Sequence, residues 1–177
     1  MLFQRNGMPP IEGPPEGVEI KFRMSVYSLV RGQDGKILVV LPNYGNKWSF
    51  PGGKMEATET FSVVIRREGL EETGLELRKL RDRHGVIIGE EFFVTRKGHW
   101  CHSIHVVFQA ELTRNTQNFA EINPEKAGER IRKMAWIELK NLRETDILPM
   151  FQEFIRRLKR EAKIPEQSVD QTSTPEP

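Results

Sequence analysis

Residues 52–75 read GGKMEATETFSVVIRREGLEETGL, and the rest of the chain is organised around this stretch. Counted from Gly53, the pattern is G-x5-E-x7-R-E-x-x-E-E-x-G-L. Seven charged or glycine positions, each with a background frequency of roughly 6–7%, would coincide by chance about once in 10^8 starting points. They are Gly53, Glu59, Arg67, Glu68, Glu71, Glu72 and Gly74. The match is therefore a signal and not a product of composition.

The second half of this stretch predicts an amphipathic helix from about Thr58 to Thr73, because threonines stand at its start, apolar residues recur at helical spacing and proline is absent. Glu68, Glu71 and Glu72 then fall at i, i+3 and i+4 and share one face. Carboxylates ~5–6 Å apart repel one another by roughly 3 kcal/mol a pair at an effective dielectric of about 20. The trio therefore favours a bound cation. Oxygen ligands without His or Cys suit Mg2+ or Mn2+ and not zinc.

The pair Gly52-Gly53 is expected to complement the acidic helix, since glycine permits a tight turn and lets backbone carbonyls approach a metal closely. The preceding residues 48–51, WSFP, read as the end of a strand that leads into this loop. Strand, glycine loop and acidic helix together predict a site for a metal-bound polyphosphate.

The stretch PGGKMEATETFSVVIRREGLEETGL, residues 51–75, resembles the Nudix box of the Nudix hydrolases. The resemblance implies an α/β fold, an α/β/α sandwich with a mixed central β-sheet. It also implies hydrolysis of a nucleoside diphosphate linked to another group, X, by a metal-activated water. In this reading Glu68, Glu71 and Glu72 bind Mg2+ or Mn2+, and the carbonyl of Gly52 is a further ligand.

The same resemblance implies supporting roles. Glu59 and Arg67 would form a salt bridge, and Glu71 or Glu72 would orient or deprotonate the water. One position departs from the family pattern, which has a bulky aliphatic residue where this chain has Gly69. Glycine inside a helix costs about 1 kcal/mol relative to alanine. We expect Leu70 to take over some of the packing.

A solvated acidic helix after an ordinary turn is the plain alternative for this stretch. It would account for an E-x-x-E-E trio alone. It does not account for Gly53, Glu59, Arg67 and Gly74 standing in register with that trio.

Composition limits the class of protein. A chain of 177 residues is expected to form one domain with a sizeable core. Its 27 Lys and Arg nearly balance 25 Asp and Glu, which gives no general case for nucleic-acid or membrane binding. The single Cys101 excludes an internal disulfide framework and is expected to be buried in a strand. No run approaches the ~20 apolar residues of a membrane span, so a cytoplasmic location is the default expectation.

The ends of the chain differ in character from its middle. Residues 1–17 are rich in proline and glycine and predict a flexible arm that orders only against the body or a second subunit, which makes a homodimer reasonable. Residues 18–164 are expected to form the Nudix domain. Residues 165–177 are polar, contain proline and predict a disordered tail.

Alternation and apolar runs predict the remaining elements. The expected elements are a strand over 22–30, a return strand over 36–41, an interrupted strand over 75–88, a polar connection over 89–98, a central strand over 100–112, a last strand over 131–139 and a helix over 146–163. Trp48 is expected to pack beneath the glycine loop.

Candidate substrate contacts lie outside the helix: Lys54 beside the expected phosphate site, Tyr44 as a ring that could stack on a base, His105 and Arg23. Alternation puts His102 and His105 on opposite faces, which argues against a histidine metal site. The irregular segment 113–130 is expected to supply one more acidic group, and Glu129 is the candidate for an accessory ligand or base.

The identity of X stays open between several classes. The short loop KWSFPGGK, residues 47–54, resembles enzymes acting on nucleoside triphosphates, including oxidised ones. We favour (deoxy)nucleoside triphosphates or nucleoside diphosphate sugars; ADP-ribose, dinucleoside polyphosphates and capped RNA remain alternatives. A non-catalytic nucleotide sensor or an interaction module on the same fold would also be compatible with the sequence.

Overall fold

The computed structural model of the protein describes residues 1–5, 8–32, 34–95, 97–113 and 130–162. Its strands are β1 Leu2–Arg5, β2 Met8–Glu12, β3 Ile20–Val30, β4 Ile37–Pro42, β5 Gly52–Lys54, β6 Leu77–Lys79, β7 Val86–Val94, β8 Trp100–Leu112 and β9 Ile131–Ile137. Its helices are α1 Phe61–Thr73 and α2 Gln152–Glu161, and three single 3-10 turns, Leu139–Asn141, Glu144–Asp146 and Pro149–Phe151, precede α2.

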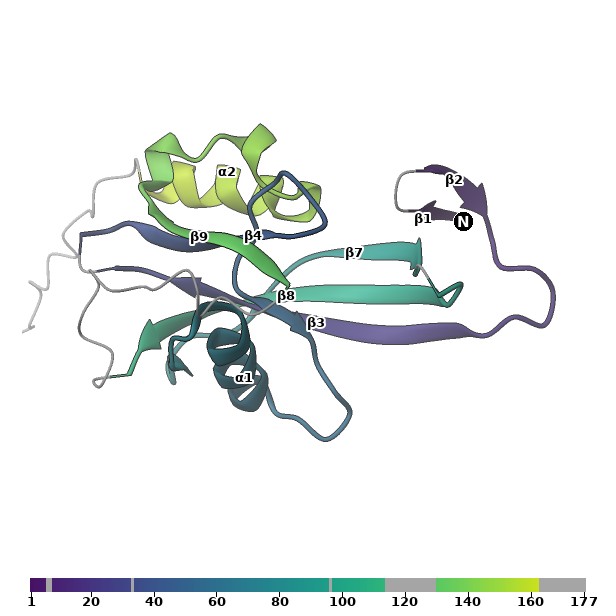
Figure 1. Cartoon of the computed structure of the whole chain (residues 1–177), viewed down its shortest axis with the longest axis horizontal. Helices are drawn as coiled ribbons and strands as arrows, with labels where there is room; N and C mark the ends of the chain where they lie inside the picture. The colour runs from purple at the N-terminus through teal and green to yellow at the C-terminus, as the bar shows by residue number, and fades with distance from the viewer. Residues whose placement is uncertain (6–7, 33, 96, 114–129, 163–177) are drawn as a thin grey trace, which may run out of the picture.

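The larger sheet has seven strands in the order β2-β1-β7-β8-β3-β5, with β6 also paired to β8. The β1–β7 and β3–β8 pairs are parallel and the other pairs are antiparallel. Strands β4 and β9 form a separate antiparallel pair. Helices α1 and α2 lie on opposite sides of the strands (Figure 1). The expected α/β class with a mixed central sheet is confirmed.

Two apolar clusters hold these layers together. One joins α2 and the 3-10 turns to Leu29, Val39 and Val107. The other joins α1 and β6 to the opposite face of the large sheet, and includes Val26 and Val106. Strand β8 pairs with three neighbours and contributes to both clusters, as expected of the central strand.

The return strand predicted over 36–41 is present as β4, but its expected pairing with the preceding strand is wrong. Beyond a single bridge between Arg31 and Ile37, β4 pairs with β9. The reason lies in its continuous apolar run. Ile37 and Val39 enter one apolar cluster while Leu38 enters the other, so β4 lies between the two cores and not beside β3.

The polar connection expected over 89–98 is also wrong for its first half, because β7 continues to Val94. The strand pairs with β8 on one side and with β1 on the other. Glu90 and Glu91 can be accommodated there because this part of the sheet projects beyond both helices (Figure 1). Just beyond the strand, the Gly98 N–H donates a 2.9 Å hydrogen bond to the Thr95 carbonyl.

The N-terminal residues, predicted to order only against the body or a second subunit, lie against the body. Strands β1 and β2 form a hairpin, and β1 pairs with β7 of the body. Phe3 is fully buried and packs edge-on against Phe92 and Trp100, with ring centroids 5.4 and 4.7 Å apart. This apolar anchor gives the hairpin its position. The tail predicted over 165–177 lies outside the described residues.

The expectation for Cys101 is confirmed, and Trp48 has an apolar environment. Cys101 is buried in β8, and Trp48 packs against the apolar cluster that contains α2. Within the described ranges, no helix combines the length and apolar character that crossing a membrane requires.

Candidate active site

The acidic helix α1 is defined at both ends by local chemistry. The Thr60 side chain accepts a 3.4 Å hydrogen bond from the Val63 N–H, and Gly74 ends the helix in the left-handed conformation. Gly69 has a structural reason, since a Cβ there would lie 2.7 Å from Leu77 Cγ. The glycine lets β6 pack close to the helix. Leu70 does not compensate for it, contrary to expectation, because 43% of its surface is exposed.

The two glycines of β5 allow the helix to approach the sheet. A Cβ on Gly52 would lie 2.2 Å from the Val26 carbonyl oxygen, and the φ of +147° disfavours any other residue. A Cβ on Gly53 would lie 2.7 Å from Glu68 Oε1. The Gly52 N–H donates a 2.9 Å hydrogen bond to Glu72 Oε2, so strand and helix meet directly at their functional groups.

Arg67 connects the carboxylates on the other side of the site. Its Nε and Nη2 bind the two oxygens of Glu59 at 2.6 and 2.9 Å, which is the salt bridge that the sequence implied. Its Nη1 lies 2.6 Å from Glu68 Oε1 and 3.4 Å from Glu71 Oε2. The Arg67 hydrogen bonds lower the pKa of Glu59 to about 2. Glu59 therefore acts as a permanently charged support for Arg67.

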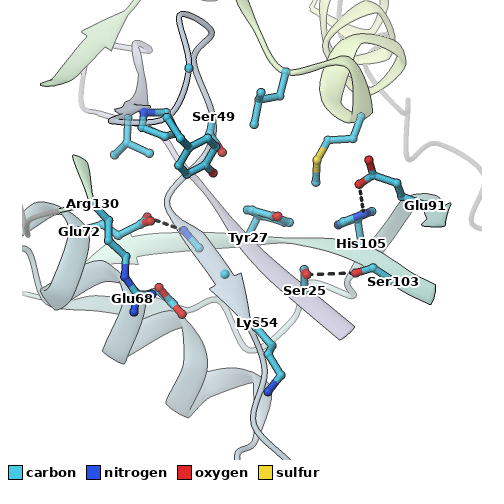
Figure 2. A pocket seen from close by; sticks show the side chains of 18 of the residues that line it. Ser25, Tyr27, Ser49, Lys54, Glu68, Glu72, Glu91, Ser103, His105 and Arg130 are labelled. Atoms are coloured by element: carbon cyan, nitrogen blue, oxygen red, sulfur yellow. Dashed lines mark hydrogen bonds and ion pairs between the residues drawn. The ribbon is translucent and has the colours of Figure 1, made fainter. Parts of the chain in front are cut away.

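The three clustered glutamates have different environments. Glu68 is buried, Glu72 is partly buried and Glu71 is exposed. Burial raises the pKa of Glu72 to about 8 and also raises the pKa of Glu68, and the neighbouring carboxylates add to both shifts. Arg130 opposes these shifts, and Figure 2 shows its side chain reaching Glu68 and Glu72. Such carboxylates gain stability from a nearby cation.

A hard metal ion fits this donor set by chemistry, because buried carboxylate oxygens beside a glycine backbone are the ligands that Mg2+ and Mn2+ prefer. The arrangement is not that of a closed metal cluster. Across the described residues, no three His, Cys, Asp or Glu side chains converge on one point. Glu68 and Glu71 bind Arg67, and Glu72 binds the Gly52 N–H. Glu129, the predicted accessory ligand, lies outside the described residues.

A cleft of about 1230 Å³ opens in front of the helix and runs over the exposed face of the large sheet. It brings Glu68, Glu71 and Glu72 together with all four of the predicted substrate contacts, which are Lys54, Arg23, Tyr44 and His105. Among these, Lys54 is held by an ion pair with Glu56, at 2.9 Å from Nζ to Oε2.

The far end of the cleft contains residues that the sequence did not single out. Ser25 and Ser103 share a 3.2 Å hydrogen bond between their hydroxyls, and Glu91 Oε2 lies 3.6 Å from His105 Nε2 (Figure 2). Alternation in β3 places Arg23 and Ser25 on one face, which was a usable signal. The partners on β7 and β8 were not accessible from local pattern, because they depend on long-range strand pairing. Arg130 is the last residue of the irregular segment 113–130, and no local pattern marks it.

Comparison with known proteins identifies the family of this chain. A NUDIX domain model matches residues 21–162. No curated protein matches the chain. Among solved structures, the MutT protein of Methanosarcina mazei Go1 has a TM-score of 0.59 at 24% identity, covering 84% of this chain and 100% of that one.

Two further structures share the fold. A NUDIX hydrolase from Nitrosomonas europaea has a TM-score of 0.56 at 19% identity, covering 81% of this chain and 91% of its own. An ADP-ribose pyrophosphatase from Streptococcus suis 89-1591 has a TM-score of 0.52 at 17% identity, covering 81% and 93%. All three structures are less than 25% identical to this chain, so their similarity shows a shared fold and no more.

Proposed function

Because the chain belongs to the Nudix family, whose enzymes hydrolyse pyrophosphate bonds, we propose that it is a magnesium-dependent pyrophosphohydrolase acting on a nucleoside diphosphate linked to X. The observation that carries the proposal is the meeting of Glu68 and Glu72 with the glycines of β5 in one cleft. (Deoxy)nucleoside triphosphates and nucleoside diphosphate sugars are the proposed substrates, and ADP-ribose, dinucleoside polyphosphates and capped RNA are the alternatives.

The metal would be held by Glu68, Glu71 and Glu72, with the Gly52 carbonyl and Glu129 as further ligands. When bound, Mg2+ neutralises diphosphate oxygens and lowers the pKa of a coordinated water. Glu68 and Glu71, which contact Arg67 in the structure, would have to turn part of their oxygens from Arg67 toward the cation. Glu59 keeps Arg67 in place during this movement through its two hydrogen bonds.

Glu72 is the residue that we assign to the proton of the attacking water, with Glu71 as the alternative. In the protein without metal, burial raises the pKa of Glu72 to about 8, and the Gly52 N–H holds one of its oxygens at the cleft. A general base has to lie within hydrogen-bond reach of the proton that it takes. Lys54 and Arg130 line the same cleft and carry positive charge toward the phosphates. Charge neutralisation and positioning supply most of the acceleration in phosphoryl transfer.

The names of the structural neighbours do not select a substrate. They include a MutT protein and an ADP-ribose pyrophosphatase, and both are below 25% identity. A cytoplasmic location and a homodimer remain proposals from the sequence.

The test is a nucleotide panel incubated with Mg2+ or Mn2+ and assayed for phosphate and pyrophosphate release, with identification of the products. Metal-dependent cleavage at a phosphoanhydride bond is the expected result. Nucleotide binding without hydrolysis would support a sensor instead. A stable protein partner, combined with no thermal shift by any nucleotide, would support an interaction module.

A further inference from the structure

His105 is a buried residue with unused hydrogen-bonding capacity. It lies in β8 with 4% of its surface exposed, and it lines the cleft. Neither of its ring nitrogens has a hydrogen-bond partner among the described residues. The 3.6 Å separation from Glu91 Oε2 is too long for a hydrogen bond. Because a buried polar group without a hydrogen-bond partner destabilises the protein, this position is suited to a ligand that supplies one.

The strand register surrounds His105 with polar side chains on the same face. Ser25 stands opposite His105, and the next row along the strands contains Arg23, Ser103 and Glu91. The Nε of Arg23 is also buried and has no hydrogen-bond partner within the described part of the chain. The group combines one positive and one negative side chain with two hydroxyls. It therefore matches an uncharged ligand that both donates and accepts, and not another phosphate.

The aromatic rings lining the cleft distinguish a sugar from a base at this end. The Arg23 guanidinium lies over the ring of Phe93, 5.4 Å from its centroid. The rings of Tyr27 and Phe151 are perpendicular, with centroids 4.9 Å apart, and the Tyr27 ring also lies beside His105, with centroids 6.0 Å apart. A planar base would need a free ring face to stack on, whereas a hydroxylated ring needs hydrogen-bonding groups. Tyr44, 65% exposed, is the remaining lining ring and is available to a base.

The sheet also sets the distance between the two ends of the cleft. Gly52 pairs with Tyr27, and the His105 row lies two residues further along β3 and two strands across. Strands ~4.8 Å apart and ~3.4 Å of rise per residue give about 12 Å. His105 is therefore the member of the group nearest to the glycines of β5, and Arg23, Ser103 and Glu91 lie one row further along the strands.

We propose that Arg23, Glu91, Ser103 and His105 form a binding site for the sugar of a nucleoside diphosphate sugar, which would make that class the substrate. The inference rests on the proposed function. In this arrangement the Glu91 carboxylate accepts hydrogen bonds from sugar hydroxyls, and Arg23 and His105 donate to or bridge them. Sugar binding would satisfy the nitrogens that are unpaired in the free protein.

The chain contains a matched control on the opposite face of the same two strands. His102 Nε2 lies 3.0 Å from Glu90 Oε2, and this pair is outside the cleft. The experiment therefore compares H105F and E91Q with H102F and E90Q. Steady-state hydrolysis of UDP-glucose, ADP-ribose and dGTP is measured for each variant, together with its melting temperature.

For H105F and E91Q we expect kcat/KM on the better nucleotide sugar to fall about tenfold or more, mainly through KM, which corresponds to at least one lost hydrogen bond to a charged or buried group. Turnover of dGTP should change by less than about twofold, because dGTP lacks the sugar that these side chains would bind. The melting temperature of H105F should not fall, because the substitution removes buried nitrogens that have no hydrogen-bond partner. The two control variants should behave as wild type toward all three nucleotides.

Equal losses on dGTP and on the nucleotide sugars would overturn the inference, as would hydrolysis of dGTP with no activity on either sugar. Both results would leave the proposed hydrolase intact. Absence of hydrolysis for every nucleotide would overturn the proposed function. In that case the thermal shift that ADP-ribose causes is compared between wild type and H105F. Loss of the shift in H105F would support the sugar site, and a shift equal to that of wild type would overturn it.

Discussion

The backbone N–H of Gly52 lies 2.9 Å from Glu72 Oε2 and donates a hydrogen bond to it. The bond joins β5 to the end of α1, which lies twenty positions later in the sequence. It holds the most strongly perturbed carboxyl of the cluster against the strand that faces the cleft. The relationship makes Glu72 the most informative residue to change.

E72Q should lose hydrolysis by a factor on the order of 10^2–10^3, as when a group that stabilises the transition state is removed. The fold should persist, because a glutamine oxygen can still accept the hydrogen bond from Gly52. Turnover and the melting temperature are measured together. E76Q, which changes a carboxylate outside the cleft, is the control. Near-normal turnover by folded E72Q would refute the role assigned to Glu72.

The charge of Glu59 should stabilise the protein in a defined pH range. Its pKa is lowered in the folded state from 4.5 to about 2, chiefly by the hydrogen bonds of Arg67. A lowered pKa means that the stabilisation is fully present above pH 4.5 and is lost as the pH falls through 4.5 toward 2. In urea unfolding, wild type should exceed E59Q in stability at pH 7 by more than at pH 3. A difference independent of pH would contradict this origin of the stabilisation.

G69A should destabilise the protein although alanine is the better helix former by about 1 kcal/mol. The added Cβ would lie 2.7 Å from Leu77 Cγ and 3.0 Å from the Leu75 carbonyl oxygen. Overpacking of this kind costs roughly 1–3 kcal/mol. The double variant G69A/L77A tests the cause, because it removes the side chain that the new methyl meets. Its unfolding free energy should exceed the value expected if the two single changes were additive.

G52A and G53A should separate stability from metal binding. The Cβ of G52A would meet fixed backbone 2.2 Å away, so its melting temperature should fall clearly. The Cβ of G53A would meet the flexible end of Glu68, so that variant should stay folded but hold Glu68 in a different place. Titration with Mn2+ should then show weaker binding by G53A than by wild type. Equal Mn2+ affinity in folded G53A would argue against Glu68 as a ligand.

Local chemistry explains which parts of the fold were predictable. The sequence predicts α1 from its apolar spacing, its lack of proline and the glycine at position 74. The predicted start, Thr58, lies three residues before the observed start at Phe61, and the predicted end is correct. Alternation gave β8 its full length and placed His102 and His105 on opposite faces. These features depend on residues close together in the sequence.

Partners in space were harder to predict, because alternation tells which face a side chain takes but not which strand lies beside it. For this reason the sequence predicts that β4 pairs with β3, and it contains no pattern that links Glu91 to His105. The same limit applies to Gly69, whose reason is Leu77 of a later strand. Phe3 shows the converse, since one aromatic residue positions a hairpin whose composition resembles that of a loose arm.

The parallel register of β3 and β8 runs through eleven consecutive pairs, from Ile20 with Trp100 to Val30 with Ala110. Side chains alternate between the two faces of a strand. A shift of β3 along β8 that keeps each side chain on its own face must therefore be a multiple of two residues, about 7 Å. A change of strand register would therefore change the distance between the two ends of the cleft, and so the length of ligand that fits, only in steps of about 7 Å. Finer adjustment has to come from side-chain size and from the loops at the rim.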